Sequence, residues 1–284
     1  MKIANVSGRL ALVSDEGGVD VAAASNGRFG PDPQAVYSEW KAFREWADDA
    51  PSRGAAPIDV NDLGAPAPRP AQVFAIGANY RDHAAEAGLE VPASPATFTK
   101  FPTCLTAPFA DVVLPSETVD WEVELVVVMG MRAYQVSPAG AWDLVAGVTV
   151  GQDLSDRLVQ LTSGGHFSLS KSFPGFGPTG PWLVTPDELA DPDDLELGCR
   201  VDGQEVQKSR TSAMVFGVPE LIARLSAVLP LLPGDLIFTG TPGGIGATRQ
   251  PPQFLRPGQV LSSYIEGVGT MANRLIAPPT QTQR

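Results

Sequence analysis

The chain is poor in the residues that most often build redox and zinc sites. Its 284 residues include 2 cysteines and 2 histidines. Cys104 and Cys199 are far apart and show no metal-ligand spacing, so neither a disulfide framework nor a thiolate zinc site is predicted. A chain without disulfides fits a reducing compartment, and we expect a cytoplasmic protein.

Long apolar stretches and an excess of positive charge are also missing. The longest apolar runs, such as residues 125–129, are much shorter than the roughly 20 residues that span a bilayer. Residues 1–15 contain no continuous apolar core of a targeting segment. The chain has 32 acidic residues against 20 lysines and arginines, and its net charge of −12 repels nucleic acid and anionic membranes. An anionic substrate must therefore be attracted locally, by a metal or by a few placed cations.

The first part of the chain predicts a small N-terminal unit. Apolar runs at residues 2–6 and 9–13 are joined by Ser7-Gly8, which is typical of a hairpin turn. A helix is predicted next, because apolar residues recur at helical spacing at Val36, Trp40, Phe43 and Ala47.

Alternating prolines mark the boundary of this unit. Residues 65–71 read Ala-Pro-Ala-Pro-Arg-Pro-Ala, a pattern that forbids a helix and indicates an extended linker. We therefore expect an N-terminal domain of residues 1–68 and a main domain of residues 69–284.

The main domain is predicted to be rich in strands. Apolar runs lie between turn residues at 73–76, 123–129, 145–150, 195–201 and 236–239. Several runs are continuous rather than alternating, which is typical of strands covered on both faces. Asp202-Gly203 predicts a hairpin turn. A helix is predicted to open at Pro219 and to end before Pro230, with one apolar face formed by Leu221, Ile222, Leu225 and Val228.

Two glutamates stand one residue apart at the start of a predicted strand. Because a strand alternates faces, Glu122 and Glu124 point the same way, while Val123 points the other. The valines that follow indicate a buried strand, where two adjacent carboxylates need a cation between them. The same pattern also fits an exposed edge strand with both glutamates in water, and the pair alone leaves both interpretations open.

Asp153 strengthens the metal interpretation. It follows the apolar run 145–150 and Gly151, where the end of a strand would place it at the rim of the same sheet. Three carboxylates without histidine or cysteine form a hard oxygen site, suited to Mg²⁺ or Mn²⁺, with Ca²⁺ as an alternative. From spacing alone, ordinary surface acids remain an equal alternative.

Six short motifs follow one another along the main domain. They are Gly77-Ala-Asn-Tyr-Arg-Asp-His-Ala-Ala-Glu86, Asp120-Trp-Glu-Val-Glu-Leu125, Gln152-Asp-Leu-Ser-Asp-Arg157, Lys171-Ser-Phe173, Gly177-Pro-Thr-Gly-Pro-Trp182 and Thr239-Gly-Thr-Pro-Gly-Gly244. In this order, the motifs resemble those of the fumarylacetoacetate hydrolase family and cover nearly all of residues 72–274. The N-terminal unit is similar to that of the two-domain members.

The resemblance implies an α+β, mostly β fold. Its main domain would be a rolled mixed β-sheet, preceded by a small α/β domain, and two copies would form a homodimer. Family members cleave a carbon–carbon bond of acylpyruvates and other 2,4-diketo acids, decarboxylate oxaloacetate or isomerise unsaturated keto diacids. A small-molecule keto acid is thus the implied substrate.

The resemblance also implies roles for single residues. Glu122, Glu124 and Asp153 fall on the family's metal ligands. His83 and Glu86 fall on its catalytic dyad. Lys171 falls on a catalytic position that lines the substrate site, where a cation would help an acidic protein to hold an anion; a surface lysine is the alternative for this residue alone. Thr241 lines the implied substrate site.

The chemistry of the dyad agrees with its spacing. If residues 81–87 form a helical turn, His83 and Glu86 lie on one face, and the carboxylate can orient the imidazole and make it a better base. An exposed His–Glu pair is the alternative for this spacing alone. His166, in a Gly-rich loop, is interpreted as structural. Arg157 and Gln160 are weaker candidates for substrate binding, since an arginine there can instead brace a loop.

The glycine-rich loop at residues 239–246 follows a predicted strand. Its glycines would let backbone N–H groups approach an anion, and Thr241 could bind a substrate carboxylate. The loop lacks the Gly-Lys-Ser/Thr ending of a nucleotide-binding P-loop, so nucleoside triphosphate binding is not predicted. A structural turn is the other interpretation.

Three functional hypotheses result. The first is a metal-dependent hydrolase that cleaves an acylpyruvate-like or other 2,4-diketo acid, and the second is an oxaloacetate decarboxylase or keto-acid isomerase or tautomerase with the same site. The third is a member that binds a keto acid without turnover, against which the intact His83–Glu86 pair argues. Pro174, where relatives commonly have an acidic residue, affects the expected substrate more than the reaction class.

Overall fold

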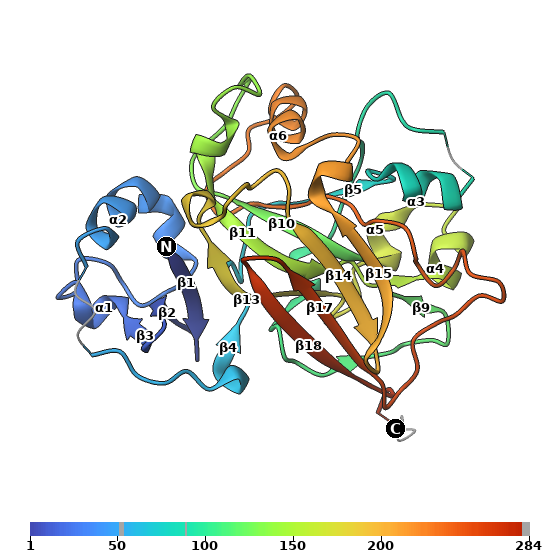
Figure 1. The fold of residues 1–284 in the computed structure, drawn as a ribbon, viewed down its shortest axis with the longest axis horizontal. Coiled ribbons are helices and arrows are strands. Elements are labelled where there is room, and N and C mark those ends of the chain that lie inside the picture. Colours follow the sequence, from blue (N-terminus) through green and yellow to red (C-terminus); the bar gives the residue numbers. More distant parts are fainter. Residues whose placement is uncertain (51–53, 89, 280–284) are drawn as a thin grey trace.

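The computed structural model describes residues 1–50, 54–88 and 90–279 (Figure 1). Within these ranges the larger sheet has 11 strands and the second sheet has 5. In spatial order, the larger sheet contains β3 (Gly17–Asp20), β2 (Arg9–Ser14), β1 (Lys2–Val6), β13 (Gly177–Val184), β11 (Val145–Gln152), β10 (Val123–Met129), β16 (Leu236–Phe238), β5 (Val73–Gly77) and β6 (Ala96–Thr99), with β4 (Leu63–Gly64) beside β1 and β7 (Leu105–Thr106) beside β13.

The second sheet and the helices complete the structure. The sheet runs β15 (Gln204–Arg210), β14 (Glu196–Val201), β17 (Val260–Ile265), β18 (Gly269–Ile276) and β8 (Val112–Val113), and β9 (Val119–Asp120) pairs separately with β12 (Ser155–Asp156). The α-helices are α1 (Val21–Ala24), α2 (Trp40–Ala47), α3 (Arg81–Glu86), α4 (Arg157–Thr162), α5 (Phe167–Ser170) and α6 (Val218–Ser226). The 3-10 helices are Ala35–Glu39, Val60–Asp62, Pro102–Cys104, Ala141–Leu144, Pro186–Glu188 and Thr211–Ala213.

The larger sheet is mixed, as the predicted fold requires. Its strand pairs are antiparallel except that β16 runs parallel to β5 and β13 runs parallel to β7. All five predicted strands are present, as β5, β10, β11, β14 and β16. Both predicted hairpin turns have two residues with positive φ, at Ser7 (49°) and Gly8 (80°) and at Asp202 (50°) and Gly203 (82°), which is the type I′ geometry that fits the strand twist.

One detail of the predicted helix at Pro219 is wrong. Leu221, Ile222 and Leu225 are buried, but α6 ends at Ser226, and Val228 lies beyond it with 77% of its surface exposed. The N–H groups of Ala227, Val228 and Leu229 still bind helix carbonyls in a final turn, and Pro230 prevents further helix because the residue before a proline is disfavoured in the helical conformation. The apolar face therefore stops one turn earlier than predicted.

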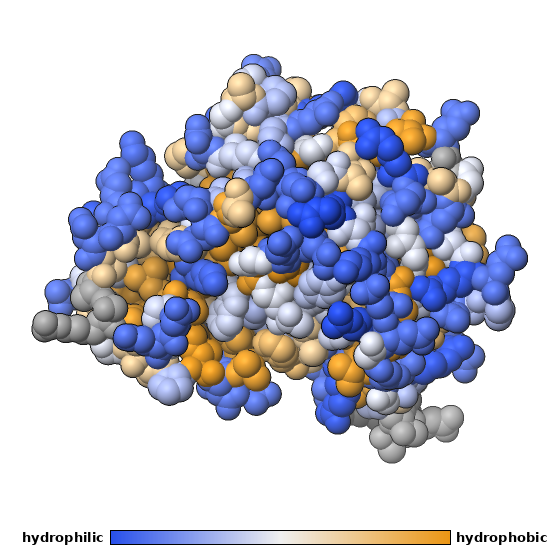
Figure 2. All heavy atoms as spheres, viewed as in Figure 1, coloured by the Kyte–Doolittle hydropathy of each residue, from blue (hydrophilic) through white to orange (hydrophobic). Residues whose placement is uncertain are grey.

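The N-terminal unit is joined to the main body through the sheet. β1 pairs with β13, with Ile3 opposite Leu183, so the larger sheet continues across the linker. Phe43 is fully buried in a cluster that also contains Val126 and Phe238 of the main domain. In Figure 2 the hydrophobic atoms on this face gather over the N-terminal unit and its junction with the body, whereas the rest of the face is mostly hydrophilic.

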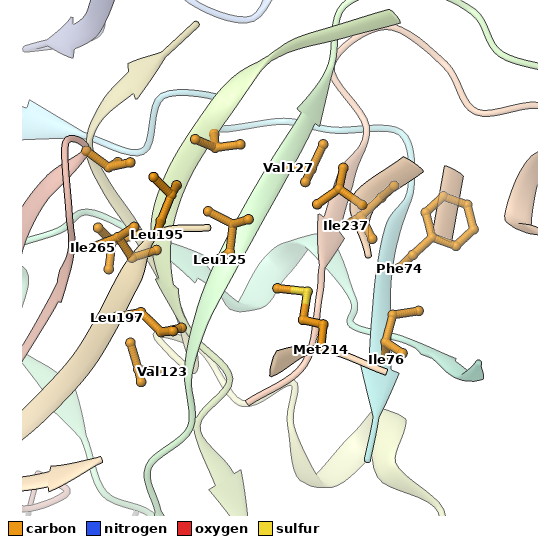
Figure 3. Close-up of a cluster of buried hydrophobic side chains, with 14 of the residues drawn as sticks. Phe74, Ile76, Val123, Leu125, Val127, Leu195, Leu197, Met214, Ile237 and Ile265 are labelled. Carbon is orange, nitrogen blue, oxygen red and sulfur yellow. The ribbon is translucent and has the colours of Figure 1, made fainter. Parts of the chain in front are cut away.

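The main core lies between the two sheets and fixes the orientation of β10. Val123, Leu125 and Val127 all belong to this core, together with Leu195 and Ile265 from the second sheet's side (Figure 3). Because side chains alternate along a strand, Glu124 is left on the opposite face of β10. The core residues thus determine the direction of the carboxylates.

None of the helices within the described ranges has both the length and the apolar character needed to cross a membrane.

Candidate active site

Antiparallel pairing of β10 and β11 brings the three predicted carboxylates together. Val123, at the start of β10, lies opposite Gln152, at the end of β11. Glu122 precedes the first and Asp153 follows the second, and the Asp153 N–H donates to the Glu122 carbonyl at 2.9 Å. One carboxylate oxygen from each of Glu122, Glu124 and Asp153 lies within 4.8 Å of the others, and all three residues are buried.

Two buried lysines, Lys100 and Lys171, and the partly buried Arg157 neutralise two of these carboxylates. Lys171 Nζ lies 2.7 Å from both Glu122 Oε2 and Asp153 Oδ2. Arg157 donates to Glu122 Oε1 at 2.7 Å. Lys100, which no motif of the sequence predicts as a site residue, donates to Asp153 Oδ1 at 2.6 Å and also to the carbonyls of Lys171 and Phe176. Glu122 and Asp153 therefore each have two cationic partners.

Glu124 has no such partner. Its Oε2 accepts the Gly240 N–H at 2.8 Å, and it forms no ion pair with any residue that the structure describes. Burial and the negative charges of Asp153 and Glu122 raise the pKa of Glu124 well above its usual value. Burial also opposes ionisation of Glu122, but Lys171 and Arg157 outweigh it and lower that pKa to about 2. The cluster thus lacks positive charge at Glu124.

The donor set fits a hard divalent cation. The oxygens of Glu122, Glu124 and Asp153 converge without a sulfur or nitrogen ligand, which suits Mg²⁺, Mn²⁺ or Ca²⁺. Together with Asp120, the buried carboxylates outnumber the nearby cations Lys100, Lys171 and Arg157 by one. A dication would compensate this excess and leave a net positive site for an anion.

Substitution of Lys100 tests the charge balance of the carboxylate cluster. Lys100→Met should lower the free energy of unfolding by about 3–5 kcal/mol, because removal of one partner leaves a buried carboxylate uncompensated. Thermal or urea unfolding of the metal-free protein measures the change. Lys41→Met, at an exposed lysine of α2, is the control and should cause little change. Equal stability of the two variants would contradict the assigned charge balance.

The predicted His–Glu pair lies on α3, which begins after β5. His83 Nδ1 is 3.0 Å from Glu86 Oε1, and the two side chains are 12% and 25% exposed. Partial burial tends to raise the pKa of Glu86, but the His83 ring and the Gly244 N–H lower it overall. The same loop also donates to the carboxylate cluster, because its Gly240 N–H binds Glu124 while its Gly244 N–H binds Glu86. The predicted dyad and metal ligands therefore share one site.

The glycine-rich loop contacts the protein's own carboxylates. Its Gly240 N–H donates to Glu124, and its Gly244 N–H donates to Glu86, each at 2.8 Å. The Thr241 hydroxyl donates to the Val123 carbonyl at 2.9 Å and accepts from Gln207 at 2.8 Å. In this structure the loop is a support for the site, and binding of a substrate carboxylate by the Thr241 hydroxyl would require that hydrogen bond to break.

Arg157 and Gln160 also have protein partners. The Arg157 guanidinium binds Asp120 as well as Glu122, and it donates to Gln160 Oε1 at 3.1 Å. This is the bracing arrangement that was the alternative to substrate binding. His166 is exposed at the start of α5.

Several buried residues that support the site were not identified from the sequence. The side-chain oxygens of Gln152 and Gln207 accept the backbone N–H groups of Glu122 and Val123, at the start of β10, at 2.9 and 3.0 Å. A lysine without a recognised motif is expected at the surface, so the burial of Lys100 could not be predicted from the sequence. Asp120 is the first residue of the motif that contains Glu122 and Glu124, and this position is the signal that could have identified it as a site residue.

The fold and the site together define a class of protein. A mixed sheet carries three converging carboxylates, suited to a hard cation, beside a His–Glu pair. Residues 72–276 match the fumarylacetoacetate (FAA) hydrolase C-terminal family. The chain belongs to the fumarylacetoacetate hydrolase family, which confirms the predicted family and fold class.

Individual relatives are similar over most of the chain. The mitochondrial oxaloacetate tautomerase of Rattus norvegicus is 42% identical over 214 residues, 75% of this chain and 68% of that protein. A protein of known structure from Mycobacterium smegmatis is 52% identical, with a TM-score of 0.93 and coverage of 98% of this chain and 100% of that chain. Maleylpyruvate hydrolase from Sphingobium sp. SYK-6, solved with manganese(II) and pyruvate, is 28% identical, with a TM-score of 0.81 and coverage of 98% and 100%.

Proposed function

We propose that this protein is a divalent-metal-dependent enzyme that interconverts the keto and enol forms of a small 2-oxo acid, with oxaloacetate as the first candidate. The observation that supports this most is the carboxylate cluster of Glu122, Glu124 and Asp153, which lacks one positive charge and lies beside the His83–Glu86 pair. The oxaloacetate tautomerase from rat supports the choice of reaction, because it is 42% identical over 75% of the chain.

Enolisation requires a base, and His83 is suited to this role. The Glu86 carboxylate accepts a hydrogen bond from Nδ1–H of His83, so Nε2 is the ring nitrogen that exchanges a proton. In the proposed reaction, Nε2 removes a proton from the carbon next to the 2-carbonyl. The electron pair of that C–H bond forms the C=C bond of the enolate, and the π pair of the carbonyl moves onto its oxygen. The imidazolium then returns the proton to that oxygen, which yields the enol. Glu86 stabilises the imidazolium and fixes its orientation.

The remaining charges hold the anion. A divalent cation bound by Glu122, Glu124 and Asp153 would supply positive charge beside the oxygens on which negative charge develops. Lys171 and Arg157 hold Glu122 in place and lower its pKa to about 2, so this carboxylate stays ionised. The burial of Lys171 and Glu122 limits solvent screening of the site.

Hydrolysis of a 2,4-diketo acid is the second candidate. It is favoured by the Sphingobium maleylpyruvate hydrolase, whose structure contains manganese(II) and pyruvate. Here His83 would take a proton from water, and the hydroxide would add to the distal carbonyl. The bond between C3 and the distal carbonyl carbon, C4, would then break, and its electron pair would form the pyruvate enolate. The imidazolium would protonate that enolate.

A substrate screen separates these reactions. The protein, with Mg²⁺ or Mn²⁺ and with chelator, is incubated with oxaloacetate and with acylpyruvates, and products are followed by ¹H and ¹³C nuclear magnetic resonance. Faster keto–enol exchange of oxaloacetate without loss of carbon dioxide supports the first candidate. Pyruvate plus a carboxylic acid from an acylpyruvate supports the second. Pyruvate plus carbon dioxide from oxaloacetate, or no turnover of any compound, would overturn the proposed tautomerisation.

Glu86 should act through the imidazole, which predicts a loss of rate without a loss of metal. In Glu86→Gln the imidazolium loses its neighbouring anion and the amide orients the ring less firmly, so kcat should fall by about 10-fold or more. Mn²⁺ affinity should be kept, because the three converging carboxylates are unchanged. Glu39→Gln, at an exposed glutamate, is the control. An unchanged kcat would remove Glu86 from this role.

The expected homodimer and cytoplasmic location stay predictions from the sequence. Analytical ultracentrifugation of the purified protein measures the first, and a tagged protein in fractionated cells measures the second.

A further inference from the structure

One loop is bonded to three different carboxylates of the site. Between residues 240 and 247, peptide N–H groups donate to Glu124, Glu86 and Asp120. Glu124 belongs to the metal cluster and Glu86 to the His–Glu pair, but Asp120 belongs to neither. The loop therefore links the two parts of the site, and Asp120 is its third attachment.

Asp120 is completely buried and uses both of its oxygens. Oδ1 accepts the N–H groups of Trp121 and Gly246 at 2.8 and 2.7 Å. Oδ2 accepts the Ala247 N–H at 3.0 Å and Arg157 Nε at 2.9 Å. Such a set of donors requires a carboxylate, because an amide side chain offers one acceptor oxygen only. Asp120 thus joins the loop to the arginine that binds Glu122.

The loop has little freedom to shift around this attachment. A Cβ on Gly246 would lie 1.9 Å from the Gln253 carbonyl oxygen and 2.8 Å from Asp120 Oδ1. A Cβ on Gly244 would lie 2.4 Å from the Val206 carbonyl oxygen, and its φ of +102° also favours glycine. The Gly244 N–H that holds Glu86 is therefore only two residues from a tightly packed anchor.

We propose that Asp120 is a positioning residue that sets the location of the His83–Glu86 pair relative to the metal carboxylates. On one side it fixes Gly246 and Ala247, which place the Gly244 N–H against Glu86. On the other side it fixes Arg157, which holds Glu122. This inference rests on the proposed function for its kinetic consequence, whereas its structural consequence can be measured without a substrate.

The kinetic test uses Asp120→Asn, with the metal-loaded protein and a turned-over 2-oxo acid. We expect kcat to fall by about 10- to 100-fold, since a displacement of about 1 Å at the reacting groups has an effect of this size. KM and the Mn²⁺ dissociation constant should each change by less than about threefold, because the substrate and metal ligands are retained. Asp111→Asn, at an exposed aspartate paired with Arg274, is the matched control and should retain full activity.

Amide hydrogen exchange tests the structural consequence in the metal-free protein. In Asp120→Asn, exchange at residues 81–88 and 240–247 should be faster by about tenfold or more, while the strands of the second sheet keep their rates. If the proposed function fails and no 2-oxo acid is turned over, this measurement still decides the role of Asp120. Unchanged exchange at residues 81–88 would overturn the proposal, as would an unchanged kcat.

A second variant tests the same contact in case Asp120→Asn fails to fold. Ala247→Pro removes one N–H donor to Asp120 without removing any charge. It should reproduce the lower kcat and the faster exchange at α3, with metal binding retained. Loss of Mn²⁺ affinity in proportion to the loss of kcat, in either variant, would assign Asp120 to metal binding instead and overturn the positioning role.

Discussion

Glu124→Gln should abolish tight binding of Mg²⁺ or Mn²⁺ and lower kcat/KM by on the order of 10³-fold, because a bound cation contributes several kcal/mol of charge stabilisation. The same change should not destabilise the metal-free protein. Glu124 has no ion pair among the described residues, and its charge is repelled by Glu122 and Asp153. Glutamine has nearly the same shape, and its oxygen can still accept the Gly240 N–H.

Glu122→Gln should differ from Glu124→Gln in the stability of the metal-free protein. It should also lose the metal, but it leaves Lys171 and Arg157 with an uncharged partner and should cost about 3–5 kcal/mol of stability. Calorimetric titration with Mn²⁺ and thermal unfolding in chelator measure both quantities. Glu117→Gln, at an exposed glutamate, is the control. If Glu124→Gln destabilised the metal-free protein as much as Glu122→Gln, the charge balance described for the cluster would be wrong.

His83→Ala should lower kcat/KM by about 10²- to 10⁴-fold, the usual contribution of a positioned acid–base group. Metal affinity should stay within about threefold of the original, since the imidazole is not among the three converging carboxylates. His166→Ala is a natural control, because the chain has 2 histidines and His166 is exposed at the start of α5. We expect that variant to keep its activity.

The comparison of the two histidine variants separates two roles for His83. A loss of kcat/KM with unchanged Mn²⁺ binding supports a base in proton transfer. Equal activity of both variants would exclude His83 from proton transfer. A loss of Mn²⁺ binding in His83→Ala would instead place His83 in the support of the metal cluster.

The carboxylate cluster could be predicted because it depends on local patterns. The alternation of Glu122, Val123 and Glu124 follows from strand geometry, and the apolar residues determine which face is buried. Asp153 joins them because β10 and β11 are antiparallel and in register, with Val123 opposite Gln152. The sequence indicated that Asp153 ends a strand, while the pairing itself became visible only in the structure.

The supporting residues could not be predicted, because their partners are distant in the sequence. Lys100 reaches Asp153 across 53 positions, and no local pattern distinguishes it from a surface lysine. The glycine-rich loop is predicted to place N–H groups near a substrate anion, whereas in the structure these groups bind the protein's own Glu86, Glu124 and Asp120. Such contacts depend on tertiary structure.

The proline-rich linker shows the same limit at the level of the fold. Its alternating prolines indicated an extended connection, and β1 nevertheless pairs with β13, so the larger sheet continues beyond it. Periodicity identifies strands, but it does not identify which strands pair when they are more than 170 positions apart. The buried cluster of Phe43, Val126 and Phe238 likewise joins residues that are distant in the sequence, so periodicity could not predict it.

The most direct test is a crystal of the protein soaked in MnCl₂, measured for anomalous scattering at the manganese absorption edge. We expect one strong peak per chain, in contact with the carboxylate oxygens of Glu122, Glu124 and Asp153, and no such peak in Glu124→Gln. A peak elsewhere, or manganese bound equally well in the variant, would contradict the assignment of these residues as a cation site.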